Sequence, residues 1–420
     1  MVDKNLFIYD LAVAAIFKDE GKYLKEWLDY HLLAGVDHFF LYNNDSTDDY
    51  EKVLAPYVEK KLVTLINFSG KGMQTPAYDN AIERFRFFCR YMTFIDLDEF
   101  IFPKNNQSIS EVVDEILFQD EQAAALGINW QCFGSNGQKT ADYSRGVLER
   151  FTRRAQDNWI AVEGKNYAGN IYIKTVMNPR WYDYFIGPHY ATYFQNLKSI
   201  NADGRRTYMA GSHPISTDKI VINHYYTKSK EEFFKKKMTR GWACSGEVPY
   251  DEKNFKVCDR NEVFDDGILK YRAARAENFS LESYDERIRR AEKVLIKILT
   301  QRSPFDAPPE FFIGKLETFL TCRALAEKLG TKIGSKTAEE YALVWIYQTL
   351  NKNRVLTYAE LQLFVNALPE ILARPFPLAK KIVREFSARV LPAMMNAAKD
   401  FQTWKVYKNL TLLQRLLNSI

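Results

Sequence analysis

The sequence predicts an α/β fold with a mostly parallel sheet, followed by an all-α domain. The first part of the chain alternates apolar, strand-like runs with helix-like segments, and strands joined through helices pair in parallel. From about residue 281 onward, apolar residues recur at helical spacing and strand signals are few. A chain of 420 residues is long enough for two domains. We therefore expect a first domain over residues 1–278 and a helical domain over residues 279–420.

The strands and helices of the first domain are expected to alternate. The run Leu11–Phe17 predicts a buried strand, and the helix predicted over Glu20–Ala34 ends at Gly35, a residue typical of helix C-termini. Ser108–Glu111 and Ser229–Glu232 both have the pattern of a capping box, which predicts a helix start. Further strands are expected over 38–42, 62–68 and 91–95, and further helices over 77–90, 284–300, 309–329, 337–350 and 358–372.

Cysteine usage and apolar runs restrict the class of protein. The five cysteines are widely spaced, without a Cys-x-x-Cys pair, which argues against a disulfide framework and against a thiolate zinc site. No apolar run approaches the ~20 residues that span a bilayer, and no secretory signal is visible. We therefore expect a bacterial, cytoplasmic protein or a piece of a longer one.

Positive charge is concentrated at the end of the chain. Residues 371–420 hold nine Lys or Arg and two acids, so the remainder carries −2 of the total charge of +5. This slight negative charge disfavours nucleic-acid binding. The basic residues are interspersed with Trp404, Tyr407 and several leucines. The segment therefore fits either an amphipathic helix lying peripherally on an anionic membrane, or a helix packed on its neighbours with a solvated basic face.

Two carboxylates stand one residue apart directly after an apolar run. Asp96 and Asp98 follow residues 91–95, and side chains at i and i+2 of an extended segment point to the same face. They are therefore suited to bind one hard cation, Mn²⁺ or Mg²⁺. The polar turn Asn43–Asp48 also follows a predicted strand. Because ligands of parallel sheets bind at the carboxyl ends of strands, we expect both segments to line one crevice.

The region from Gly127 to Asn223 has a different composition. Trp, Tyr, Asn and Gly recur in its strands and loops, as in the segment Trp130–Gly137. Aromatic faces stack on the C–H faces of sugar rings, while neighbouring amides bond the hydroxyls. The region therefore suits a sugar-binding surface. For about half of these aromatic residues, we expect packing in the core or in turns instead.

Five segments, in chain order, resemble the GT-A-type glycosyltransferases, and most closely glycosyltransferase family 92. They are Glu26–Phe39, Tyr42–Asp48, Asp96–Phe100, Trp130–Gly137 and His224–Gly241. The resemblance covers residues 12–245, a little over half of the chain, and does not extend to the helical region. It implies a GT-A catalytic domain with a Rossmann-like sheet, acting on a nucleotide sugar.

The resemblance assigns the metal and the donor to particular residues. Asp98 is expected to ligate Mn²⁺ or Mg²⁺ directly, His224 to supply a nitrogen ligand, and Asp96 to bind the metal less directly or to hold the ribose. Lys228 and Arg240 are candidates for the phosphates, or else belong to a solvated charged face. The other expected contacts to the nucleotide sugar are Lys18, Glu20, Asn43, Asp45, Gln74, Asp79 and Asn80.

Family 92 is classed as inverting, which implies one carboxylate that deprotonates the acceptor hydroxyl. Among the acids at 142, 149, 157, 163, 183 and 247 we favour Glu163 as this base, and we expect Trp130 and His189 on the acceptor side. The resemblance thus implies metal-dependent transfer of a hexose, galactose above all, from a UDP-sugar to a glycan or lipid-linked glycan. The expected setting is surface polysaccharide or lipopolysaccharide synthesis at the inner face of the cell membrane.

Two other functions fit the same residues. A metal-dependent phosphohydrolase or nucleotidyltransferase also uses paired aspartates, but it needs a further acidic cluster for a second metal, and none stands out in the sequence. A non-catalytic glycan-binding protein would keep the aromatic surface without the chemistry. A test of nucleotide binding distinguishes these functions, because either kind of enzyme would bind a nucleotide and the glycan-binding protein would not.

Overall fold

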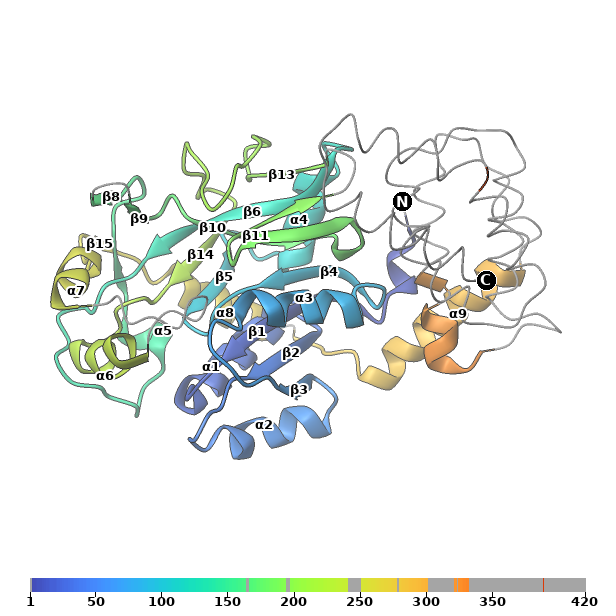
Figure 1. The fold of residues 1–420 in the computed structure, drawn as a ribbon, viewed down its shortest axis with the longest axis horizontal. Helices are drawn as coiled ribbons and strands as arrows, with labels where there is room; N and C mark the ends of the chain where they lie inside the picture. The colour runs from blue at the N-terminus through green and yellow to red at the C-terminus, as the bar shows by residue number, and fades with distance from the viewer. Residues whose placement is uncertain are drawn as a thin grey trace. The chain divides into compact units, whose positions relative to one another are not determined.

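The computed structural model describes residues 2–163, 166–193, 197–240, 251–277, 279–300, 321–322, 324–331 and 388 (Figure 1). The chain divides into two compact units, one of residues 7–288 and one of residues 1–6 together with 289–420. The sheet and the site described below belong to the first unit. The expected domain boundary between residues 278 and 279 stays a prediction.

Four parallel strands form one half of the main sheet, in the order β3-β2-β1-β4. The helices between them return the chain to the opposite edge each time, so all four carboxyl ends lie at one edge of the sheet. The predicted alternation is confirmed, with α3 shifted toward the N-terminus relative to the expected 77–90. The strands are β1 (Tyr9–Phe17), β2 (His38–Asn43), β3 (Val63–Asn67) and β4 (Cys89–Phe94), and the helices are α1 (Gly21–Leu33), α2 (Tyr50–Glu59) and α3 (Gln74–Phe85).

Two antiparallel strands interrupt the other half of the sheet. β10 (Ile173–Met177) lies between β4 and β6 (Ala123–Cys132) and runs against both. β14 (Ile220–His224) is parallel to β6, and β5 (Glu99–Pro103) pairs antiparallel with β14. β13 (Lys198–Ile200) also pairs with β6, in parallel. The sheet is mostly parallel, as predicted, and its antiparallel strands bring residues distant in sequence beside β4.

Helices cover both faces of the sheet. Leu11 and Val13 of β1 belong to the buried cluster that holds Trp27 of α1. On the opposite face, Tyr78 of α3 contacts Phe94 of β4 with ring centroids 5.0 Å apart. Successive strand residues point to opposite faces, so β1 contributes apolar side chains to both layers. The mixed α/β class is therefore confirmed.

The other elements are short or lie outside the main sheet. Two hairpins follow β6 along the chain, β8 (Ile160–Glu163) with β9 (Asn166–Gly169) and β11 (Tyr182–Gly187) with β12 (Tyr190–Tyr193). The remaining elements are α4 (Ile109–Leu117), α5 (Val147–Arg150), α6 (Lys230–Arg240), α7 (Glu252–Cys258), α8 (Gly267–Glu277), α9 (Tyr284–Thr300), β7 (Arg153–Arg154), β15 (Val263–Phe264) and the 3₁₀ turns Lys4–Leu6 and Pro179–Trp181.

Only part of the predicted helical region can be compared with the structure. The helix predicted over 284–300 is confirmed by α9. The helices predicted over 309–329, 337–350 and 358–372, and the basic segment 371–420, lie wholly or mainly outside the described residues. Within the described part of the chain, no helix is long and apolar enough to cross a membrane. The cysteines described there, Cys89, Cys132, Cys258 and Cys322, are free thiols.

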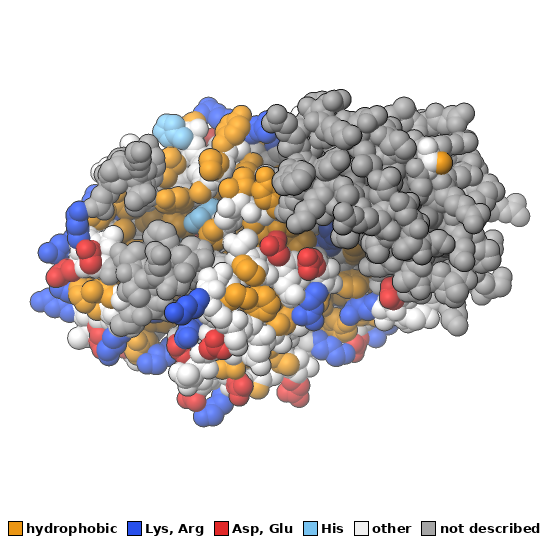
Figure 2. Space-filling model, in the orientation of Figure 1, with side chains coloured by type: hydrophobic (Ala, Val, Ile, Leu, Met, Phe, Trp, Pro, Cys, Tyr) orange, Lys and Arg blue, Asp and Glu red, His pale blue; other side chains and the backbone are white. Residues whose placement is uncertain are grey.

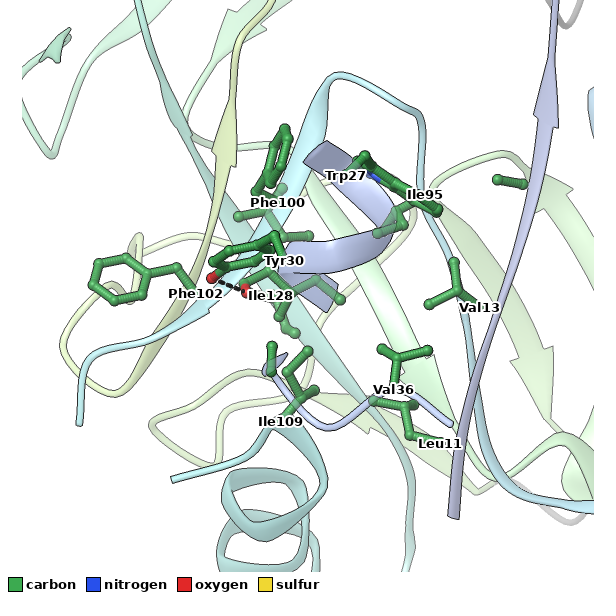
Figure 3. Packing of buried hydrophobic residues seen from close by; sticks show 14 of the residues in the cluster. Leu11, Val13, Trp27, Tyr30, Val36, Ile95, Phe100, Phe102, Ile109 and Ile128 are labelled. Carbon is green, nitrogen blue, oxygen red and sulfur yellow. Dashed lines mark hydrogen bonds between the residues drawn. The ribbon is translucent and has the colours of Figure 1, made fainter. Parts of the chain in front are cut away.

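Helix α1 is bonded to strand β5 through its buried face (Figure 3). The Trp27 indole N–H donates to the carbonyl of Glu99 at 2.9 Å, and the Tyr30 hydroxyl donates to the carbonyl of Ile101 at 2.8 Å. The amide of Ile101 donates in turn to Nε2 of His31 at 3.3 Å. Three side chains of one helix thus fix the backbone of the strand that begins directly after Asp98.

The predicted capping box at the start of α4 is present. Ser108 Oγ accepts from the amide of Glu111 at 3.3 Å, and the Glu111 carboxylate accepts from the amide of Ser108 at 2.7 Å. We expect Ser108→Ala to lower the free energy of unfolding by about 1 kcal/mol, because it leaves an N-terminal amide of the helix without its acceptor. Denaturant unfolding measures the change. Ser108→Thr keeps the hydroxyl and is the matched control, so an equal loss in both variants would contradict the cap.

Candidate active site

Residues Asp96–Asp98, which we call the acidic turn, meet the end of β14 at the edge of the sheet. Asp98 follows β4 and directly precedes β5, and the register of β14 pairs His224 with Glu99. The amide of Tyr225 donates to the carbonyl of Asp98 at 2.8 Å, which fixes the two chain segments together. As a result, Nε2 of His224 lies 3.6 Å from Oδ1 of Asp98. Two of the three predicted metal ligands are therefore neighbours.

Lysines from the segment after β14 surround the Asp98 carboxylate. Oδ2 of Asp98 accepts from Nζ of Lys237 at 2.8 Å and lies 4.0 Å from Nζ of Lys228. Burial by itself raises the pKa of Asp98, but Lys237 and Lys228 outweigh it and hold this pKa well below its usual range. Asp98 is thus an ionised carboxylate that is only 8% exposed. Two cations at one carboxylate mark a position where more negative charge can be accommodated.

Asp96, the third predicted metal ligand, is held by other partners. Its Oδ1 accepts from Nε2 of Gln74 at 2.7 Å, and its Oδ2 lies 3.2 Å from Nζ of Lys174. Within the described ranges, no group of three or more His, Cys, Asp or Glu side chains is arranged to hold a metal ion. The structure therefore brings Asp98 and His224 together and places Asp96 beside them, in a separate ion pair.

The donor set of Asp98 and His224 fits a hard or borderline divalent cation. One carboxylate oxygen and one imidazole nitrogen are ligands that Mn²⁺ accepts, and Nδ1 of His224 has no hydrogen-bond partner among the described residues. Burial lowers the pKa of His224, although Asp98 raises it, so the imidazole is biased toward the neutral form that binds metals. Such a cation takes further oxygen ligands in its remaining coordination positions.

Sequence reasoning assigned no role to Glu99, which is fully buried behind the two aspartates. Its Oε2 accepts from the amide of Asp96 at 2.8 Å and lies 3.6 Å from Nζ of Lys174. Its Oε1 has no hydrogen-bond partner in the described part of the chain. Burial raises the pKa of Glu99 to about 8, against the opposing charge of Lys174. A third acid directly after an Asp-x-Asp pair was the only sequence signal for it.

The predicted nucleotide contacts on α3 line the same edge. Gln74 bonds Asp96, as described above, and is itself buried. Oδ1 of Asn80 accepts from the Tyr42 hydroxyl at 3.0 Å, and Asp79 accepts from the hydroxyl of Tyr182. These side chains are therefore positioned by internal hydrogen bonds, and Gln74 is the one that directly contacts the acidic turn.

The polar side chains of the turn after β2 bond mostly to neighbouring segments of the chain. The side-chain Nδ2 of Asn43 donates at 3.0 Å to the Tyr50 hydroxyl and at 3.0 Å to Oδ1 of Asn67. Its Oδ1 accepts from the backbone amide of Ser46 at 3.0 Å. Asp45 is exposed, and a hydrogen bond from Ser69 lowers its pKa. Asp45 therefore has a carboxylate accessible to solvent, whereas the amide of Asn43 already has three partners.

The two predicted contacts directly after β1 differ in their surroundings. Lys18 is half-buried at the end of the strand. Glu20 is buried and forms an ion pair with Lys236 of α6, whose ammonium lies 4.9 Å from the Tyr23 ring centroid. Helix α6 thus contacts the segment after β1 through Lys236 and the acidic turn through Lys237.

Helix α6 begins at a buried ion pair, and the capping box predicted there is present. Ser229 Oγ donates to Glu232 at 2.5 Å and accepts from the Glu232 amide at 3.3 Å. Arg150 donates to the same carboxylate at 3.1 and 2.5 Å, and both side chains are 2% exposed. The preceding residue, Lys228, has φ of +49°, an uncommon conformation for a residue other than glycine. This anchored start holds the ammonium of Lys228 4.7 Å from the Tyr23 ring centroid, beside Asp98.

Three predicted side chains, those of Glu163, Arg240 and Glu247, lie outside the described part of the structure, although the backbone of Glu163 ends β8 and that of Arg240 ends α6. The other candidate bases have partners of their own. Asp157 accepts from Gln131 at 2.9 Å and from Arg154 at 2.8 Å, Asp142 accepts from Ser144, Glu149 from Arg272 and Asp183 from Thr192.

Aromatic rings stand next to His224 on the predicted acceptor side. The Trp130 ring lies 4.1 Å from the ring of His224 and 5.2 Å from that of His189, measured between centroids. Nδ1 of His189 is 3.0 Å from the carbonyl of Ile173, and burial lowers its pKa to about 3. Trp130 and His189 are thus neighbours, and the low pKa keeps the His189 imidazole neutral.

Comparison with known proteins identifies related sequences over the region that carries this site. A family model, glycosyltransferase family 92, matches residues 11–255, which include Asp96, Asp98, His224 and helix α6. A family 92 protein of Ricinus communis is 26% identical over 147 residues, which are 35% of this chain and 26% of that protein. A related protein of Oryza sativa subsp. japonica is 27% identical over 147 residues, 35% of this chain and 25% of that protein. The match thus spans about a quarter of each plant relative.

Two further similarities are more limited. A galactan beta-1,4-galactosyltransferase of Arabidopsis thaliana is 30% identical over 100 residues, which are 21% of this chain and 19% of that protein. Among solved structures, residues 1–349 of TarS from S. aureus cover 75% of this chain and 80% of that chain, at 13% identity and a TM-score of 0.29.

Proposed function

The chain belongs to glycosyltransferase family 92, and on that premise we propose that it transfers a hexose from a nucleotide sugar to a glycan, with a divalent cation bound at Asp98 and His224. The observation that carries the proposal is the buried pair of one carboxylate and one imidazole, 3.6 Å apart at the carboxyl edge of the sheet. Lysines 228 and 237 stand beside that pair. A diphosphate would bring the negative charge that these groups are arranged to receive.

Each group has a defined part in the proposed transfer. A cation bound at this site would neutralise the diphosphate and stabilise it as the leaving group. Lys228 and Lys237, which stand beside the Asp98 carboxylate, would bind the phosphates. Asp96, fixed by Gln74 and Lys174, would accept from the ribose hydroxyls rather than ligate the metal, because its carboxylate is already aligned by these two donors.

Inversion at the anomeric carbon requires a base for the acceptor hydroxyl, and we retain Glu163 for this role. It stands at the end of β8, where it pairs with Asn166 of β9 at the tip of a hairpin. Trp130 and His189 would form the acceptor side.

The donor and the setting of the reaction are proposed with it. We propose a UDP-sugar carrying galactose, which the similarity to a plant galactan galactosyltransferase supports. We also propose a glycan or lipid-linked acceptor of a surface polysaccharide or lipopolysaccharide, and action at the inner face of a bacterial membrane. The basic segment 371–420 would provide the peripheral attachment.

Nucleotide-dependent thermal stabilisation tests the donor and metal assignments together. We expect UDP and UDP-galactose to raise the melting temperature in the presence of Mn²⁺, because a ligand at a hundred times its Kd adds about 2.7 kcal/mol to the folded state. Without Mn²⁺, or with GDP-mannose in place of UDP-galactose, the shift should be much smaller. The absence of any nucleotide shift would contradict the proposal and favour a glycan-binding protein.

A further inference from the structure

A line of aromatic rings leads away from the Asp98 and His224 pair. Trp130 contacts His224, and its ring centroid lies 5.2 Å from that of His189 and 5.1 Å from that of Tyr172. Tyr172 and His189 stack on each other at 5.2 Å with an interplanar angle of 27°. Rings from β6, from the chain before β10 and from the β11–β12 hairpin thus form one continuous group.

The β11–β12 hairpin is also bonded to the loop that follows β13, which carries an exposed aromatic ring. Tyr190, next to His189, donates from its hydroxyl to the carbonyl of Thr207 at 3.4 Å. The residue after Thr207 is Tyr208, whose side chain is 66% exposed, with the Arg206 guanidinium 5.2 Å from its ring centroid. We call Trp130, Tyr172, His189, Tyr190 and Tyr208 the aromatic track.

Backbone hydrogen bonds hold the outer end of the aromatic track in place. The amide of Thr207 donates to the carbonyl of Ser199 in β13 at 2.9 Å, and the amide of Ile173 donates to the carbonyl of Ala210 at 3.0 Å. The loop therefore bonds to a strand at each side of β6. Gly127 of β6 permits this approach, because a Cβ at that position would lie 3.1 Å from Cγ2 of Thr207.

The aromatic track has free binding capacity at both ends. At the inner end, the buried Nε1 of Trp130 has no hydrogen-bond partner among the described residues. Its N–H group therefore still has a hydrogen bond to donate. At the outer end, Met209 is 63% exposed beside Tyr208. Figure 2 shows hydrophobic side chains gathered over strands β10 and β6 on this face, with histidine side chains among them. An exposed apolar cluster that is continuous with a site usually marks a binding surface.

We propose that the aromatic track binds an oligosaccharide acceptor, with its reacting sugar at Trp130 and its next sugars along Tyr172 and Tyr190 to Tyr208. This inference deepens the proposed function and rests on it. Sugar rings suit the surface because their C–H faces stack on aromatic rings, while their hydroxyls would accept from the Trp130 indole N–H. The occupant is therefore a chain of at least two sugars rather than a single sugar or a lipid.

Binding of sugars of different length tests the aromatic track. We would titrate the protein with galactose, glucose, mannose and N-acetylglucosamine and with oligosaccharides of each, and compare affinities with and without UDP and Mn²⁺. We expect at least one oligosaccharide to bind more tightly than its monosaccharide. Tyr208→Ala should reduce this preference about tenfold, the loss that corresponds to one stacked ring at about 1.4 kcal/mol.

Phe264→Ala is the matched control, because Phe264 is 61% exposed but lies on β15, which pairs with β7 outside the main sheet. It should leave the preference for the longer sugar unchanged. The proposal would be overturned if no oligosaccharide bound more tightly than its monosaccharide, or if Tyr208→Ala kept the full preference. Failure of the proposed function is recognised separately, because the thermal shift with UDP and Mn²⁺ needs no acceptor.

Discussion

Asp98→Asn is expected to reduce sugar transfer about a thousandfold while the protein stays folded. The substitution keeps the shape of the side chain but removes the charge that faces His224, Lys228 and Lys237. A bound metal contributes several kcal/mol to stabilising charge in a transition state, and each 1.36 kcal/mol is a factor of ten in rate. The loss should therefore appear in kcat as well as in the apparent affinity for Mn²⁺.

The measurement is the transfer rate over a range of Mn²⁺ concentrations, with the unfolding curve recorded for the same sample. Asp49→Asn is the matched control, because Asp49 is 82% exposed and forms an ion pair with the equally exposed Lys52. Exposed ion pairs contribute little, so this variant should have the wild-type rate. A wild-type transfer rate in the Asp98→Asn variant would exclude a metal at this carboxylate. If the variant instead failed to fold, Asp98 would have mainly a structural role.

Arg150→Met is expected to lower the free energy of unfolding by about 3–5 kcal/mol, because it leaves a buried carboxylate without its cation. Both partners of this ion pair are 2% exposed, and Arg150 contributes two of the bonds to Glu232. The Tyr23 hydroxyl at 2.8 Å and Ser229 also donate to Glu232, but neither carries a charge. We therefore expect a large loss of stability from this one substitution.

The double variant Arg150→Met with Glu232→Leu separates the unpaired charge from lost packing. Removing both partners leaves no buried charge, so we expect the pair of changes to cost much less than the sum of the single ones. Guanidinium unfolding of the two single variants and the double variant completes the cycle. A loss below about 1 kcal/mol in Arg150→Met would contradict a buried, unscreened ion pair here.

Local patterns in the sequence predicted the elements that depend on neighbouring residues. The run beginning at Leu11 predicted β1, and the spacing of serine and glutamate predicted the starts of α4 and α6. These signals act over a few residues, where propensity and capping decide the structure. The antiparallel direction of β10 could not be predicted in this way, because it depends on pairing between Val176 and Thr93.

The arrangement of the site depends on similarly distant contacts. The Asp-x-Asp spacing predicted that Asp96 and Asp98 would act together, but Lys174, 78 residues from Asp96, binds the first and Lys237, 139 residues from Asp98, binds the second. Their separate partners follow from the fold, so spacing alone could not distinguish the two carboxylates. His224 lies beside Asp98, as the motif order suggested, and whether it ligates a metal stays a prediction.

The hydrogen bonds from α1 to β5 affect the thermodynamics of ligand binding. Trp27, Tyr30 and His31 fix the backbone at Glu99 and Ile101, directly after Asp98. The conformational entropy of this segment is therefore lost when the protein folds, and a ligand that arrives later has no need to order it again. Preorganisation of this kind favours affinity, so the apolar face of α1 supports binding without touching what is bound.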